Sequence, residues 1–167
     1  MKSRRSGISL LEFAIAAPVL VLGLGGVLSI GASLLRTVQA GQVCRAAAAM
    51  AAAGVDLRDP ANQRLLARAA AGLGLTQADG ESPDPNGRAA ILAARVTCDS
   101  SGEYAIQWQA VIGNQTRWQS SLQGQAARIR QFIDLRPGEQ VTFVETVVET
   151  GSLVPGLPPV VRVRNLS

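Results

Sequence analysis

The 167-residue sequence contains no histidine and only two cysteines, Cys44 and Cys98. Zinc sites need about four nitrogen or sulfur ligands, and nucleophilic catalysis by serine or cysteine commonly relies on a histidine base. The acidic residues near turns have the spacing of caps and not of a catalytic carboxylate pair. We therefore expect no metal, no cofactor, no catalytic residue and no small-molecule substrate, and we predict that the protein is not an enzyme.

Aromatic residues are also scarce, at 4% of the chain. The core must therefore be built mainly from valine, isoleucine, leucine and alanine. Large fillers are limited to a few side chains, chiefly Trp108, Trp118, Phe132 and Phe143.

The chain carries a net charge of +4, but the excess is local. Lys2, Arg4 and Arg5 precede a long apolar run, and the chain after residue 7 holds thirteen basic and twelve acidic residues. No basic stripe with interleaved aromatic residues is present. The charge pattern therefore predicts a solvated surface and no nucleic-acid partner.

Residues 13–35 contain no charged side chain. About 20 apolar residues in a helix cross a bilayer, whereas the apolar part of a secretory signal is about 7–15 residues. We expect a single transmembrane helix with the basic leader in the cytoplasm and the remainder outside. Pro18 allows a kink, and several glycines in this stretch leave a shallow surface for helix packing.

The stretch from Ser6 to Phe13 and the apolar run behind it resemble the amino-terminal signature of the type IV pilin superfamily. Glu12-Phe13 followed by Ala-Ile-Ala-Ala-Pro-Val-Leu is most similar to TadE-like proteins, the pseudopilins or minor pilins of tight-adherence (Tad, Flp) pili. The later Pro137-Gly138 turn and the valine-rich strand after it are also similar to that family.

The resemblance implies that residues 1–7 are a leader cut by a prepilin peptidase after Gly7, which leaves Ile8 as the new terminus. Glu12 then pairs with the free amine of a neighbouring subunit, and Phe13 and Pro18 belong to the assembly helix. The implied partners are the inner membrane, other pilin subunits, the pilus assembly platform and the peptidase.

Two other interpretations remain open. In the first, Gly7 is never cut, Glu12 sits at the cytoplasmic interface of a permanent single-pass anchor, and the outer part is a binding or scaffold domain. In the second, the chain is a membrane-anchored enzyme, against which the lack of histidine counts.

The expected architecture is α+β: a leader (1–7), a transmembrane and stalk helix (8–54), and an outer domain (55–167) with a small antiparallel sheet. Asp59-Pro60 predicts the start of a second helix that reaches residue 73. The predicted strands cover residues 91–99, 103–112, 140–149 and 160–164, and residues 155–159 form a stiff connector. Residues 120–134 favour a helix, although an extended segment fits part of them.

Three finer expectations concern side chains. Alternation in the second strand predicts that Tyr104, Ile106, Trp108, Ala110 and Ile112 share one face. Arg162 and Arg164 are expected to face outward in the last strand. In an oxidising compartment Cys44 and Cys98 could form a disulfide between helix and sheet, and two separate buried thiols are the alternative.

Overall fold

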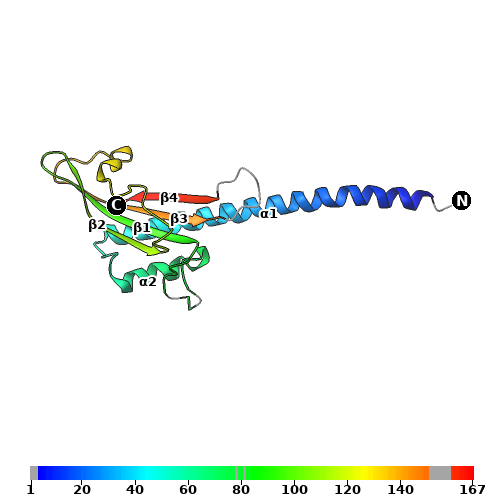
Figure 1. The fold of residues 1–167 in the computed structure, drawn as a ribbon, viewed down its shortest axis with the longest axis horizontal. Helices are drawn as coiled ribbons and strands as arrows, with labels where there is room; N and C mark the ends of the chain where they lie inside the picture. The colour runs from blue at the N-terminus through cyan, green and yellow to red at the C-terminus, as the bar shows by residue number, and fades with distance from the viewer. Residues whose placement is uncertain (1–3, 78, 81, 151–158) are drawn as a thin grey trace.

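The computed structural model describes residues 4–77, 79–80, 82–150 and 159–167, with side chains from residue 12 onward. The fold is α+β, as predicted: one long amino-terminal helix and a four-stranded antiparallel sheet. Figure 1 shows the sheet lying along one half of the helix while the other half projects beyond it. We call these parts the sheet domain (residues 36–167) and the apolar arm (residues 12–35).

The long helix is α1 (Arg4–Ala52). At about 1.5 Å per residue, its 49 residues span about 73 Å. It continues without a break through Pro18 and ends two residues before Gly54. Gly54 has φ +79°, a left-handed conformation that glycine adopts at low cost, and its N–H donates to the carbonyl of Ala51 at 3.0 Å.

The second helix, α2 (Pro60–Ala69), begins where the sequence predicts. Asp59 accepts a hydrogen bond from the N–H of Ala61 at 2.9 Å, and Pro60 occupies the first turn, where its missing N–H costs nothing. The helix is shorter than predicted. Its last turn tightens into the 3-10 helix η1 (Ala71–Leu73), which Gly74 ends with φ +75°.

The sheet has the order β2-β1-β3-β4, with every neighbouring pair antiparallel. All four predicted strands are present, with ends shifted by a few residues. Most of the predicted connector before the last strand lies outside the described residues. The strands are β1 (Ala89–Cys98), β2 (Tyr104–Gly113), β3 (Gln140–Glu149) and β4 (Val160–Leu166).

A β-bulge corrects the prediction that alternate residues of β2 share one face. Arg95 pairs with Trp108 while the next residue, Val96, pairs with Ile106, so Gln107 is an extra residue. An extra residue reverses the alternation beyond it. Trp108 therefore packs with the helices, and Ile106 packs on the opposite face of the sheet.

Both faces of the sheet are covered. One face packs against small side chains of α1 and against α2, which the sequence allows because alanines let a helix lie close to a sheet. The opposite face is covered by residues 114–135, which include the 3-10 helix η2 (Ala126–Gln131). In the core between the helices and the sheet, α1 contributes the side chains of Ala40, Val43, Cys44, Ala47, Ala48 and Ala51. On the opposite face, the core between the sheet and the covering segment includes Val96, Leu122, Ile129 and Phe143.

The predicted helix over residues 120–134 is wrong for most of its length. Only the six residues of η2 are helical, and they form a 3-10 helix. Gln123 and Gly124 precede it with φ 49° and +74°, and these left-handed conformations interrupt a regular helix. The segment is instead held to the sheet by side chains, including Phe132, whose ring lies 5.2 Å from that of Phe143.

Candidate functional site

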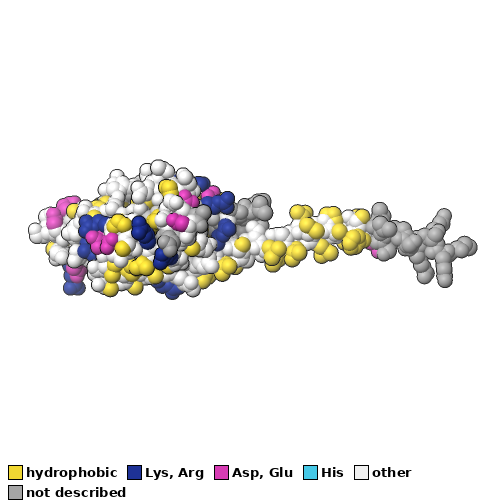
Figure 2. Space-filling model, turned by 90° about the horizontal axis from the view of Figure 1, so that it is seen from below, with side chains coloured by type: hydrophobic (Ala, Val, Ile, Leu, Met, Phe, Trp, Pro, Cys, Tyr) yellow, Lys and Arg dark blue, Asp and Glu magenta, His cyan; other side chains and the backbone are white. Residues whose placement is uncertain are grey.

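The apolar arm is the most unusual surface of the molecule. Its large side chains, together with that of Val38 just beyond it, are 44% to 76% exposed, and the described part of the chain leaves them largely uncovered. Figure 2 shows this part as a rod of hydrophobic side chains extending from a mixed polar domain. The exposed side chains are Phe13, Ile15, Val19, Leu20, Val21, Leu22, Leu24, Val27, Leu28, Ile30, Leu34, Leu35 and Val38.

This helix is long and apolar enough to cross a membrane, with a mean hydropathy of 2.3 in a window of which no residue is buried. Exposed hydrophobic surface of this extent is rare on soluble monomers and marks a site of interaction. The arm is therefore the first candidate site.

The predicted cleavage and assembly residues all lie on α1. Gly7 and Ile8 belong to its first turns, and their side chains lie outside the described part. Glu12 is exposed at the start of the arm, beside Phe13, which is 69% exposed. Among the described residues Glu12 has no ion-pair partner, so its carboxylate is available to a group from another molecule.

Four glycines of the arm, Gly23, Gly25, Gly26 and Gly31, are not required by the fold of the single chain. A Cβ added at any of them would meet no atom within 4 Å. Glycine inside a helix costs about 1 kcal/mol relative to alanine. The fold of one chain does not account for this cost, whereas close packing against another helix would use the exposed backbone.

Arg36 marks the boundary between arm and sheet domain, a role that the sequence analysis did not identify. It is the first charged residue after the apolar run. Its Nη1 donates to the carbonyl of Thr150 at 2.5 Å and to that of Glu149 at 3.4 Å. The end of β3 is thereby held against the helix at the level where the apolar surface stops.

The predicted disulfide between Cys44 and Cys98 is corrected by the structure, in which both are free and buried. Cys44 lies in the core between α1 and the sheet, where its thiol donates to the carbonyls of Val144 at 3.4 Å and Val163 at 3.5 Å. Cys98 belongs to the core on the opposite face. The sheet separates the two sulfurs, so the alternative of two separate thiols holds.

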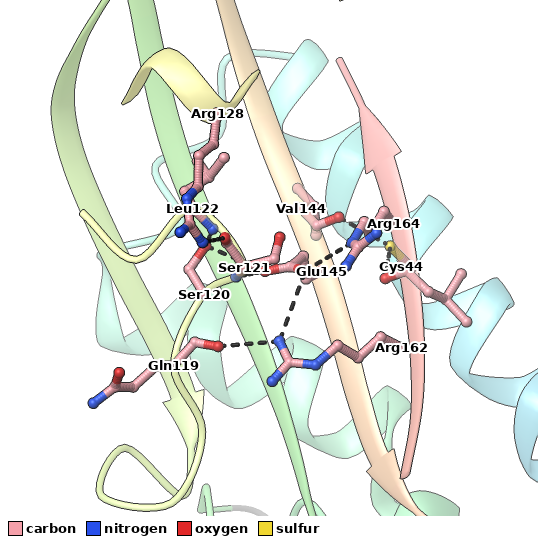
Figure 3. A network of polar contacts seen from close by, with 11 residues as sticks. Cys44, Gln119, Ser120, Ser121, Leu122, Arg128, Val144, Glu145, Arg162 and Arg164 are labelled. Atoms are coloured by element: carbon pink, nitrogen blue, oxygen red, sulfur yellow. Dashed lines mark hydrogen bonds and ion pairs between the residues drawn. The ribbon is translucent and has the colours of Figure 1, made fainter. Parts of the chain in front are cut away.

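A second polar feature centres on Glu145, which is fully buried in β3 on the face away from the helices. Its carboxylate accepts hydrogen bonds from the backbone N–H of Ser121 at 2.6 Å and the hydroxyl of Ser120 at 3.2 Å. Arg164 Nε donates to it at 3.0 Å, and Arg162 Nη1 lies 3.8 Å away. Figure 3 shows Glu145 joining β4 to the covering loop.

Glu145 was not among the predicted site residues, although the sequence contains a signal for it. An acid inside a valine-rich strand whose neighbours are buried needs a partner, because an isolated buried charge is very costly. Arg162 and Arg164, expected to face outward, do lie on the face away from α1, and they reach inward to this carboxylate. The network ties the sheet to its cover and also concentrates arginines on this face.

Asp56 and Asp99, two acidic residues of turns, accept hydrogen bonds from residues close to them in sequence. The side chain of Arg58 donates to Asp56, lowering the pKa of that exposed carboxyl to about 2. Asp99 closes the turn between β1 and β2, and its pKa is lowered chiefly by the hydroxyl of Ser101 and by the backbone N–H of Glu103.

In comparisons with protein-family models, curated proteins and solved structures, no match to the chain is found.

Proposed function

We propose that the protein is an assembly subunit of a Tad-type pilus, a TadE-like pseudopilin or minor pilin that is anchored in the inner membrane by the apolar arm. The observation that carries the proposal is the uncovered apolar arm, with a single carboxylate, Glu12, at its start, five residues after Gly7. In this proposal the leader stays cytoplasmic and the sheet domain lies outside the membrane.

The chemistry of assembly follows from the cost of isolated charges in lipid. Cleavage after Gly7 frees the amine of Ile8 near the membrane boundary. That amine and the Glu12 carboxylate of a neighbouring subunit are each costly to bury alone, and pairing offsets the cost. Because only one axial offset brings them together, the pair also sets the register between subunits.

The small residues of the arm support this proposal. Since the glycines leave the helix backbone accessible, neighbouring arms can approach closely when they leave the lipid and pack together. The sheet domain, joined directly to the same helix, would then be displayed on the outside of the assembled bundle.

The first experiment determines the amino terminus and intact mass of the membrane-expressed chain, with and without a co-expressed prepilin peptidase. We expect a terminus at Ile8 only with the peptidase, and no cleavage in a Gly7→Val variant, whose branched side chain does not fit a site for glycine. An uncut chain in both samples, with the peptidase active on a control substrate, contradicts processing and favours the permanent anchor.

The second experiment tests Glu12 itself. Glu12→Gln keeps the size of the side chain and removes its charge, so we expect normal insertion but about tenfold weaker association of processed chains in membranes, measured by cross-linking. Glu103→Gln, an exposed site in the sheet domain, is the matched control. Equal association in both variants rules out the charge-pairing mechanism.

A further inference from the structure

The face of the sheet domain that lies away from the helices contains an open cavity of about 660 Å³. It lies between β4 and the covering segment that begins after β2, beside the Glu145 network. Ten residues line it: Arg117, Gln119, Ser120, Ser121, Gln123, Arg128, Gln131, Phe132, Arg162 and Arg164. No acidic side chain is among them.

Four guanidinium groups from three parts of the fold face this cavity. Arg162 and Arg164 come from β4, Arg128 from η2, and Arg117 from the loop after β2. Figure 3 shows Arg162 and Arg164 approaching Glu145 from the strand while Arg128 reaches the loop from the other side. The spacing is set by the tertiary fold, because β4 is separated in sequence from the covering segment that holds Arg117 and Arg128 and meets it only across the sheet.

Nearby carboxylates compensate only part of this charge. Glu145 pairs with Arg164 at 3.0 Å and lies 3.8 Å from Arg162, and Glu149 pairs with Arg117 at 3.1 Å. Among the residues that the structure describes around this cavity, four cations against two anions leave two positive charges uncompensated. Within the described part of the chain, Arg128 donates to two neutral oxygens, the carbonyl of Ser121 and the side-chain oxygen of Gln125.

The arginines are held in place and still have donors to offer. Arg162 uses Nη1 for the carbonyl of Gln119 at 3.1 Å and for Glu145, and Arg164 uses Nε for Glu145 while stacking 5.1 Å from the ring of Phe132. Each guanidinium carries five N–H groups in a planar fork that matches phosphate and carboxylate oxygens. Groups ordered before a ligand arrives lose less entropy on binding it.

We propose that this cavity is a binding site for a phosphate-type oxyanion, engaged by Arg128, Arg162 and Arg164. The two uncompensated positive charges match the charge of a phosphate monoester bound through charge-assisted hydrogen bonds. This inference does not depend on cleavage after Gly7 or on assembly.

Two sources could present this group, a soluble phosphate or a lipid headgroup. Arg117, at one side of the cavity, pairs with Glu149, and the carbonyl of Glu149 is bound by Arg36 at the end of the apolar arm. That side of the cavity therefore lies close to the level at which a membrane surface would begin.

The test uses the full chain in alkyl maltoside micelles, which contain no phosphate, titrated with pyrophosphate in a calorimeter. A second assay tests a lipid headgroup. It places the same chain in nanodiscs of phosphatidylcholine, with and without phosphatidate, and measures the enrichment of phosphatidate around the protein. Arg128→Gln and Arg162→Gln are the site variants. Arg136→Gln, an exposed arginine outside the cavity, is the control.

We expect binding of pyrophosphate, of phosphatidate or of both. Each site variant should weaken this binding about fivefold or more, and Arg136→Gln should leave it unchanged. Arg128 does not contact Glu145, so its variant separates ligand binding from any loss of fold, which the melting temperature monitors. Binding of pyrophosphate identifies a soluble ligand, and enrichment of phosphatidate alone identifies a headgroup. The proposal is overturned if neither assay detects binding, or if Arg136→Gln loses as much binding as the site variants.

Discussion

At the residue scale, Glu145 is the side chain on which the region around it depends most. Its buried carboxylate accepts two hydrogen bonds from the covering loop and forms ion pairs with Arg162 and Arg164 of β4. Replacing it by glutamine keeps the shape but removes the charge that holds the arginines. We expect Glu145→Gln to lower the free energy of unfolding by about 2 kcal/mol.

This loss corresponds to a melting temperature lower by about 4–8 °C for a chain of this size. Near-ultraviolet circular dichroism in detergent micelles measures it, since Trp118 lies in the covering segment. Glu103→Gln, with an exposed carboxylate, should leave the melting temperature unchanged. A similar melting temperature in both variants would show that the buried network contributes little to stability.

The two cysteines give a second prediction at this scale. Because both thiols are buried and free, the native chain should react slowly with iodoacetamide, on either side of the sheet. In denaturant without any reductant, intact mass should show two adducts per chain. If no adducts form until a reductant is added, the two cysteines are joined by a disulfide and the assignment of free thiols is wrong.

At the element scale, the turn between β1 and β2 depends on the ionised form of Asp99. A carboxyl whose pKa is lower in the folded chain than in the unfolded chain stabilises the fold above the unfolded value, and loses this effect as the pH falls through the folded value. The pKa of Asp99 is lowered below 3.8, so its contribution is complete at neutral pH and is lost in acid.

We therefore expect Asp99→Asn to melt at a lower temperature than the parent chain at pH 7, with the difference shrinking as the pH falls below about 4. Melting curves at several pH values measure this. The same substitution at Asp134 is the control, since that exposed carboxylate lies outside this turn and accepts a hydrogen bond from the hydroxyl of Tyr104. A difference that grows in acid would contradict the assigned sign.

At the scale of the whole molecule, the prediction concerns how the apolar arm meets its surroundings. We expect the chain to stay with membranes through an alkaline carbonate wash. Val21→Arg with Leu24→Arg should release most of it, because each arginine near the centre of a spanning helix costs about 2.5–3.5 kcal/mol. Leu65→Arg changes an exposed leucine of α2 instead and should release none.

Patterns local in sequence predicted most of this fold. The charge-free run, the Asp59-Pro60 cap and the strand alternation each depend on neighbouring residues, and the corresponding elements are present. The bulge at Gln107 could not be predicted, because it depends on how β1 pairs with β2 across the hairpin. The 3-10 segment and the position of Cys98 likewise follow from the pairing of distant strands.

The candidate sites divide in the same way. Glu12 and the glycines of the arm stand in one continuous stretch, so sequence alone indicates them. The arginine cavity is assembled from β4, η2 and a loop, and nothing in the spacing of Arg117, Arg128 and Arg162 indicates that they share a surface.

The alignment of sheet and helix has a mechanical consequence. Because β3 and β4 lie along the outer half of α1, a pull on the sheet domain along the axis of α1 loads that interface in shear (Figure 1). The packed alanines, the Arg36 hydrogen bonds and the Cys44 contacts then bear the force together instead of breaking one after another. The sheet domain and α1 should therefore behave as one rigid unit. Tension applied to the outer surface of the sheet domain would reach the apolar arm before the sheet domain unfolds.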